Sequence, residues 1–130
     1  MKNSILLVDD EPNLRELLRH MLEIGGFEVI EAEDGFDALD KLAENTPDMM
    51  ILDVMMPNLD GVSLCKQLRA TARFATLPSV MMSGKTQCHA VQEGLAAGAN
   101  RYLCKPITVN ELIQTVREVL SAPAALSGSR

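Results

Sequence analysis

The sequence predicts an α/β fold in which a five-stranded parallel sheet carries helices on both faces. Short apolar runs of strand length alternate along the chain with stretches whose apolar residues recur at helical spacing. This alternation is typical of a doubly wound parallel sheet. Some of the runs are wholly apolar, as expected of central parallel strands that are buried on both sides. At 130 residues and 47 % hydrophobic, the chain is long enough for one such domain and its core.

Two strands and two helices are predicted before the middle of the chain. The continuous apolar run at 5–8 is the first strand, because it ends abruptly in two acidic residues. Leucines and a methionine recur from residue 14 at i, i+3, i+4, i+7 and i+8, which predicts an amphipathic helix that a Gly-Gly pair ends. The more polar strand at 29–32 is predicted at an edge of the sheet. A short helix through 38–42 follows, and a proline closes it.

The second half of the chain repeats the alternation. The remaining strands are the apolar runs at 49–52, 80–82 and 102–104. The remaining helices are predicted at 61–68, 86–97 and 109–120. Asp60 opens the first of these helices, the second has few apolar anchors, and the third begins with a capping box formed by Thr108 and Glu111.

Composition and charge exclude several classes of function. The chain has 12 Lys and Arg against 18 Asp and Glu, a net charge of −6, whereas nucleic acid and anionic membranes attract proteins with surplus basic residues. Aromatic residues make up only 3 % of the chain, too few for a platform on which bases stack. The apolar run near the N-terminus is too short for a signal peptide or a membrane span. We therefore expect a cytoplasmic protein that binds neither nucleic acid nor a membrane.

The three cysteines and the last ten residues complete the organisation. Cys65, Cys88 and Cys104 are odd in number and form no C-x-x-C pair, so we expect buried, reduced thiols rather than a disulfide scaffold or a zinc site. Residues 1–120 are predicted to form the domain. The Ser-, Ala-, Pro- and Gly-rich stretch 121–130 is predicted to be a flexible tail or the stump of a linker.

Polar side chains follow four of the predicted strands at the point where each strand ends. Asp9 and Asp10 follow the first strand, Asp53 the third, Ser83 the fourth and Lys105 the fifth. The carboxyl ends of parallel strands lie at one edge of a sheet, where ligands bind in open α/β folds. We therefore expect three carboxylates, a hydroxyl and an ammonium to meet there.

This set of groups suits phosphoryl transfer. Three neighbouring carboxylates repel one another, and Mg²⁺, which prefers oxygen ligands, relieves that repulsion. An ammonium has no lone pair for a metal, so Lys105 is expected to face an anion. The nucleophile should be a carboxylate, since no Cys or His lies at this edge. Singly, each group has a simpler explanation: Asp9 and Asp10 as a solvated cap, Ser83 as the start of a turn, Lys105 as a solvated strand end.

The motifs at these positions resemble one family. They are V-D-D-E at 8–11, D-x-x-M-P-x-x-D-G at 53–61, S-G at 83–84, and the stretch 97–106 that ends in K-P. Up to Leu120 the chain resembles the receiver domain of two-component response regulators. The resemblance implies a flavodoxin-like (βα)5 fold with strand order 2-1-3-4-5.

The resemblance also implies the chemistry of the site. Asp53 would accept a phosphoryl group from a phosphohistidine of a sensor histidine kinase or histidine phosphotransfer protein. Asp10, Asp53 and the backbone carbonyl of Met55 would bind Mg²⁺, or Mn²⁺ in its place, and Asp9 would act nearby or through water. Lys105 would pair with one phosphoryl oxygen and Ser83 would donate a hydrogen bond to another. Such a protein is a signalling receiver, not an enzyme, and catalyses only its own phosphorylation and dephosphorylation.

A conformational switch is the next implication. Ser83 would move towards the phosphoryl group and Tyr102 would turn inward, while the peptide bond before Pro106 would be cis. The change would reach the face formed by the fourth helix, fifth strand and fifth helix. A downstream protein or output domain would bind that face, and a phosphorylation-dependent homodimer would use it too.

Two residues set expectations for the lifetime of the phosphoryl group. Met55 and Lys85 occupy the positions that flank the path of the hydrolytic water in this family. An apolar Met55 cannot orient that water, which favours a long-lived phosphoryl group, and Lys85 could offset the effect. Gly84 stands where the family usually has Ala.

Three alternatives remain on sequence alone. A Mg²⁺-dependent phosphatase that forms an aspartyl phosphate would want a second Asp at the position of Met55. A flavin-binding module of the same fold would want a Ser/Thr/Gly-rich loop after the first strand and aromatic residues around the ring. The third alternative is a receiver-like module that is never phosphorylated and only binds partners.

Overall fold

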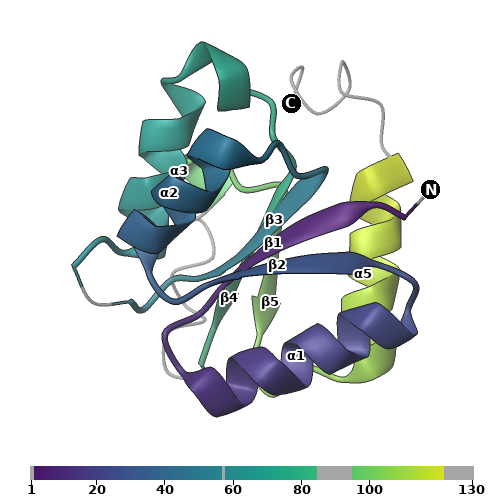
Figure 1. The fold of residues 1–130 in the computed structure, drawn as a ribbon. Coiled ribbons are helices and arrows are strands. Elements are labelled where there is room, and N and C mark those ends of the chain that lie inside the picture. Colours follow the sequence, from purple (N-terminus) through teal and green to yellow (C-terminus); the bar gives the residue numbers. More distant parts are fainter. Residues whose placement is uncertain (1, 57, 85–94, 122–130) are drawn as a thin grey trace.

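The computed structural model of the chain describes residues 2–56, 58–84 and 95–121. Its strands form one parallel sheet in the order β2-β1-β3-β4-β5 (Figure 1). They are β1 (Ser4–Val8), β2 (Glu28–Ala32), β3 (Met49–Asp53), β4 (Ser79–Ser83) and β5 (Arg101–Cys104). The predicted fold class and strand order are confirmed, with the polar strand β2 at one edge.

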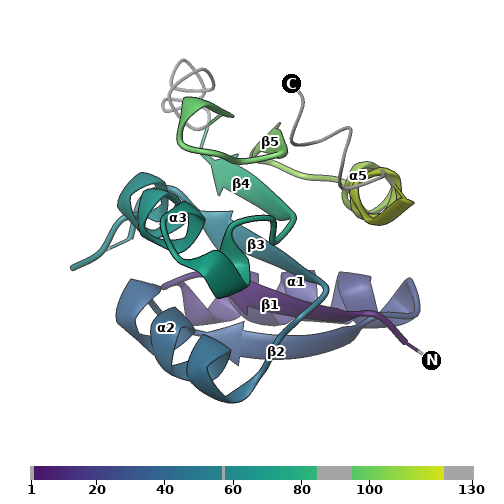
Figure 2. The same cartoon turned by 90° about the horizontal axis from the view of Figure 1, so that it is seen from above.

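Helices cover both faces of this sheet. Those within the described residues are α1 (Pro12–Ile24), α2 (Gly35–Glu44), α3 (Gly61–Arg69) and α5 (Val109–Ser121), with a 3-10 turn η1 (Ala72–Phe74) that the sequence did not predict. Helices α1 and α5 lie on one face, and α2 and α3 on the other (Figure 2). Most of the helix predicted at 86–97, and the tail 122–130, lie outside the described residues.

Two apolar cores lie on either side of the sheet. Strands β3 and β4 are buried at every position, and β1 at all but its first, because neighbouring strands and two helix layers enclose them. Alternate residues of each strand point to opposite faces: Ile5, Leu7 and Ile51 pack with α1 and α5, whereas Leu6 and Leu52 pack with α2 and α3. The sheet is therefore a rigid base for the groups at its carboxyl edge.

The connection from β3 to α3 is unusually close. A Cβ at Gly61 would lie 2.6 Å from the carbonyl oxygen of Asp53 and 2.9 Å from the Cα of Val54, so only glycine fits without moving the backbone. The Gly61 N–H donates to the Val54 carbonyl at 3.0 Å. Asp60 caps the helix by accepting a hydrogen bond from the Ser63 N–H at 2.8 Å. The start of α3 thus fixes the backbone at Asp53.

The cysteine prediction is only partly right. Cys65 is buried and free, as predicted. The prediction is wrong for Cys104, which is exposed at the end of β5 and disulfide-bonded. A four-residue strand with an exposed last position leaves that side chain at the surface, where a thiol can be oxidised. Cys88 lies outside the described residues. None of the described helices is long and apolar enough to span a membrane.

Candidate functional site

Four of the predicted side chains meet at the carboxyl edge of the sheet. Asp9, Asp10 and Asp53 each place one carboxylate oxygen within 4.8 Å of the others. The Lys105 Nζ donates a hydrogen bond to Asp53 Oδ2 at 2.6 Å and lies 3.6 Å from Asp9 Oδ2. Residues from the ends of β1, β3 and β5 therefore form one charged cluster, as expected where parallel strands end together.

Local hydrogen bonds orient two of these carboxylates in the same way. Asp9 Oδ1 accepts from the Glu11 N–H at 2.9 Å, and Asp53 Oδ1 accepts from the Met55 N–H at 2.9 Å. Each aspartate is thus held by the backbone two residues later, a common arrangement for this side chain. In both residues the other oxygen, Oδ2, is the one nearest Lys105.

Arg15 supports the loop after β1, a role that the sequence did not reveal. Its Nη1 donates to the Asp9 carbonyl at 2.7 Å, while its Nε pairs with the Glu31 carboxylate at 3.0 Å. The helical pattern only marks Arg15 as a polar position of an amphipathic helix. Its contact with Asp9 depends on how the chain turns between strand and helix, which periodicity does not encode.

Burial makes the charges of the cluster energetically important. Asp9 is fully buried and Asp53 is 5 % exposed, whereas Asp10 is exposed. Burial raises the pKa of Asp9, although the Glu11 N–H and the Lys105 ammonium oppose that change. Burial alone would lower the pKa of Lys105, but its hydrogen bond to Asp53 and the charges of Asp53 and Asp9 leave that pKa raised. Lys105 is therefore protonated at neutral pH.

The donor set fits a hard divalent cation. Asp9 Oδ2 is buried and has no hydrogen-bond partner, an arrangement that costs free energy unless something binds the oxygen. Three carboxylates face one ammonium, so the cluster has surplus negative charge. Mg²⁺ binds through a few carboxylate oxygens and keeps several waters, and exposed Asp10 leaves the cluster open to solvent.

The other predicted residues lie at the same edge or next to it. Ser83 ends β4, is fully buried, and its carbonyl accepts from the Lys105 N–H at 2.7 Å. The Tyr102 ring packs against the core on the α2 and α3 side, and its buried hydroxyl has no hydrogen-bond partner. The peptide bond between Lys105 and Pro106 is cis. Lys85 lies outside the described residues.

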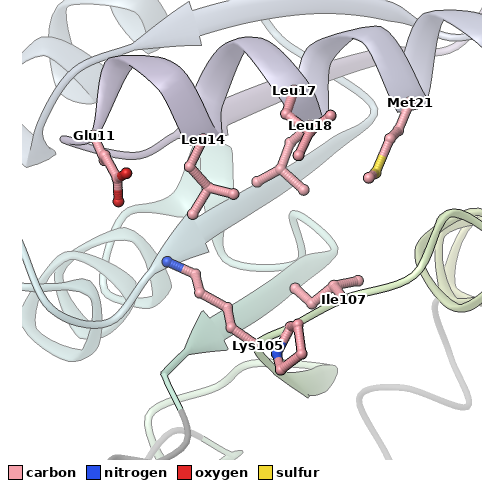
Figure 3. Close-up of a pocket in the computed structure, with 8 residues that line it drawn as sticks. Glu11, Leu14, Leu17, Leu18, Met21, Lys105 and Ile107 are labelled. Carbon is pink, nitrogen blue, oxygen red and sulfur yellow. The ribbon is translucent and has the colours of Figure 1, made fainter.

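A pocket of about 490 Å³ opens beside the cluster (Figure 3). Most of its wall is apolar and comes from Leu14, Leu17, Leu18, Met21, Pro106 and Ile107. Glu11 and Lys105 line one end, so a molecule bound there would touch the residue that pairs with Asp53. The spacing of the apolar residues in α1 predicted a face buried against the sheet. It did not predict that part of this face would line a pocket.

Comparison with known proteins identifies the family. The sequence model of one protein family, the response regulator receiver domain, matches residues 5–117. The chain belongs to this family. Response regulator MprA of Mycobacterium sp. strain KMS is 44 % identical over 120 residues, covering 92 % of this chain. These residues are 51 % of that protein, so the chain spans about half the length of the curated relatives it matches.

Solved receiver domains have the same fold. A putative response regulator from Chloroflexus aurantiacus is 37 % identical, with a TM-score of 0.90 over 94 % of this chain and all of that one. The receiver domain of the sensor histidine kinase PA1611 from Pseudomonas aeruginosa, 27 % identical with a TM-score of 0.86 over the same shares, holds a magnesium ion in its active-site cleft. Receiver domains serve two-component signalling by phosphoryl transfer from a kinase, and they bind Mg²⁺ at the active site.

Proposed function

We propose that this receiver domain accepts a phosphoryl group on Asp53 from a phosphohistidine of a sensor kinase or phosphotransfer protein. The observation that carries the proposal is the 2.6 Å hydrogen bond from Lys105 to Asp53 within a cluster of three carboxylates. Lys105 holds a positive charge at the acceptor, where an incoming phosphoryl group would add negative charge.

In the proposed step an oxygen of Asp53 attacks phosphorus while the bond from phosphorus to the donor's imidazole nitrogen breaks. The electron pair stays on that nitrogen, which takes a proton from solvent, and Asp53 becomes an acyl phosphate. Lys105 then transfers its hydrogen bond from the carboxylate to a phosphoryl oxygen. The Ser83 hydroxyl donates to another oxygen, since Ser83 ends the neighbouring strand.

The carboxylates of Asp9, Asp10 and Asp53 and the backbone carbonyl of Met55 are the groups that would hold Mg²⁺. When bound, this ion neutralises negative charge on the carboxylates and on the transferring group. The buried Asp9 Oδ2, which accepts no hydrogen bond, supports the assignment. Mn²⁺, which also prefers oxygen ligands, would serve in its place.

We assign the surface that passes the signal to a partner to the side of the sheet beyond β4. Tyr102 lies beside Met81 in the sheet, and its partnerless hydroxyl leaves the ring free to exchange positions when Ser83 moves. The signal would pass to a downstream protein, an output domain or a second copy through residues 86–97, β5 and α5. Residues 1–120 would form the receiver domain, with 121–130 as a tail or linker.

Incubation with Mg²⁺ and acetyl phosphate, followed by intact mass measurement, tests the proposal. We expect one phosphoryl adduct per chain, which disappears slowly once the donor is removed. Steady release of phosphate from small phosphoesters would instead favour the phosphatase. An unchanged mass with every small donor and with phosphorylated donor proteins would favour a module that only binds partners.

Mg²⁺ should raise the melting temperature of the wild-type protein. A ligand that binds only the folded state stabilises it by about 2.7 kcal/mol at about 100 times its Kd. Asp10→Asn should lose most of this stabilisation, because Asp10 is exposed and its replacement leaves the core intact. Asp40→Asn, the same change on the exposed side of α2, is the control. Equal Mg²⁺ shifts in both variants would exclude Asp10 as a ligand.

Met55→Asn should shorten the life of the phosphoryl group. An amide can orient the attacking water where a thioether cannot, and a hydrogen bond worth about 1 kcal/mol corresponds to about fivefold in rate. Dephosphorylation is followed by intact mass after the small donor is removed. Met55→Leu, which keeps an apolar side chain, should retain the wild-type rate. If both variants behave alike, the polarity of this side chain does not control hydrolysis.

The pocket beside Lys105 is where we place contact with the donor protein. A donor must bring its phosphohistidine to Asp53, and an apolar side chain in this pocket would anchor it within reach of Lys105. Leu17 is 51 % exposed and lines the pocket. It is the side chain on which the docking can be tested without opening the core.

Leu17→Glu should reduce phosphotransfer from the donor protein by about tenfold or more, the effect of about 1.4 kcal/mol of lost binding. Phosphorylation by acetyl phosphate should be unchanged, because that donor needs no docking surface. Ile24→Glu is the matched control, since Ile24 is 82 % exposed on the same helix and does not line the pocket. Equal losses with both donors would point to damage at the site itself.

A further inference from the structure

Met55 differs from the other described methionines in its exposure to solvent. It is 57 % exposed and lies two residues after Asp53. The strand methionines and Met56, the next residue in the chain, are at most 8 % exposed: Met49, Met50, Met56, Met81 and Met82. Met21 is partly exposed and lines the pocket beside Lys105. Among the methionines that the structure describes, a dissolved oxidant therefore reaches the side chain of Met55 first.

The main chain of Met55 touches the phosphoacceptor. Its N–H donates to Asp53 Oδ1 at 2.9 Å, so the Met55 side chain is carried by the residue whose backbone holds the phosphoacceptor. We propose that Met55 is a methionine oxidation site, and that its conversion to the sulfoxide shortens the lifetime of the phosphoryl group on Asp53. The lifetime effect rests on the proposed function of Asp53, whereas the selectivity of oxidation does not.

The oxidant is a peroxide, hydrogen peroxide being the simplest. The Met55 thioether sulfur attacks one peroxide oxygen, a sulfur–oxygen bond forms, and the oxygen–oxygen bond breaks. The leaving hydroxide takes up the proton lost from the transferred oxygen and becomes water. Methionine loses two electrons and the peroxide gains them. Methionine sulfoxide reductases reverse the product, so the proposed modification is reversible.

The sulfoxide changes what the side chain offers to water. A thioether is a weak acceptor, whereas the sulfoxide oxygen is a strong one. Carried by the residue that holds Asp53 Oδ1, the sulfoxide oxygen would bind a water molecule for attack at phosphorus. Among the described cysteines, neither competes: Cys65 is buried and Cys104 is disulfide-bonded. The reaction at this edge is therefore expected at Met55.

Peptide mapping after graded peroxide treatment tests the selectivity. Among the methionines from 21 to 82 we expect Met55 to be oxidised first, at least about tenfold faster than the buried ones, with Met21 next. Oxidation of Met21 or of a strand methionine ahead of Met55 would overturn the proposal. This measurement requires no phosphorylation, so its result stands whether or not Asp53 accepts a phosphoryl group.

Dephosphorylation of the oxidised protein tests the consequence. Mild oxidation should speed loss of the phosphoryl group by about fivefold in the wild-type protein and in Met56→Leu, which replaces the buried neighbouring methionine and is the control. Met55→Leu should be insensitive to peroxide, and Met55→Gln should lose the group quickly without oxidation. An unchanged rate in protein with Met55 oxidised would overturn the regulatory claim. Failure of the unoxidised protein to form any adduct would overturn the proposed function and, with it, the lifetime effect.

Discussion

Asp53→Asn is expected to abolish the phosphoryl adduct that acetyl phosphate and Mg²⁺ form on the wild-type protein. Asparagine has the same shape and keeps the oxygen that accepts from the Met55 N–H, but its amide is no nucleophile at phosphorus. Lys105 would also lose the charge partner that now lies 2.6 Å from its Nζ. Intact mass after incubation with the donor measures the result.

Asp60→Asn is the matched control for this change. Asp60 follows in the same loop and caps α3 through the Ser63 N–H, and asparagine caps helices as well as aspartate does. Its adduct should form at the wild-type rate. Survival of a full adduct in Asp53→Asn would place the acceptor elsewhere, with Asp9 and Asp10 the next carboxylates of the cluster.

The sheet could be predicted from the sequence because burial alone shapes its strands. The runs 5–8, 49–52 and 80–82 contain no charged residue, and only strands enclosed by neighbours and two helix layers tolerate that composition. The glutamates of β2 mark an edge for the same reason. Once the central strands and one edge strand are assigned, the rule that crossovers are right-handed leaves few topologies for five parallel strands.

The carboxylate cluster could be predicted for a geometric reason. Parallel strands end at one edge, so Asp9, Asp53 and Lys105 had to approach one another once their strands were assigned. The hydrogen bonds that turn each carboxylate could not be predicted, because they depend on backbone conformation after the strand. The same limit applies to Cys104, whose exposure follows from where β5 ends rather than from its apolar neighbours.

Arg69 makes a set of structural hydrogen bonds that could not be predicted from the sequence. Its guanidinium donates to the Gly98 carbonyl at 2.9 and 3.1 Å, to Phe74 O at 3.0 Å, to Leu77 O at 2.7 Å and to Ser79 Oγ at 3.1 Å. A basic residue in the last turn of a helix ordinarily indicates a solvated side chain near the carbonyl end. Here the chain of η1 and the turn before β5 wrap around the side chain, and no periodicity encodes that path.

Arg69→Met is expected to lower the free energy of unfolding by about 3 kcal/mol. Methionine fills much of the space but leaves the Gly98 carbonyl without a hydrogen-bond donor, and an unsatisfied buried group costs about 1–3 kcal/mol. The Phe74 and Leu77 carbonyls keep the Leu77 N–H and the Ser79 hydroxyl as donors, so each of them loses one hydrogen bond worth about 1 kcal/mol. Arg69→Lys should recover only part of the loss, because an ammonium cannot reproduce the planar fork of donors. Urea unfolding curves of the variant and the wild-type protein give the difference in unfolding free energy, provided that this free energy depends on urea concentration with the same slope in both.

Lys66→Met is the control, since Lys66 is exposed on the same helix and its replacement should change the free energy of unfolding by no more than about 0.5 kcal/mol.

The effect of Arg69→Met should also reach the phosphorylation site. Ser79 begins the strand that ends at Ser83, and Gly98 precedes the strand that leads to Lys105, so Arg69 ties together the starts of both strands. Arg69→Met should therefore slow phosphorylation by acetyl phosphate even at temperatures where it stays folded. If Arg69→Met lowers the free energy of unfolding by less than about 1 kcal/mol, water replaces the guanidinium at these carbonyls.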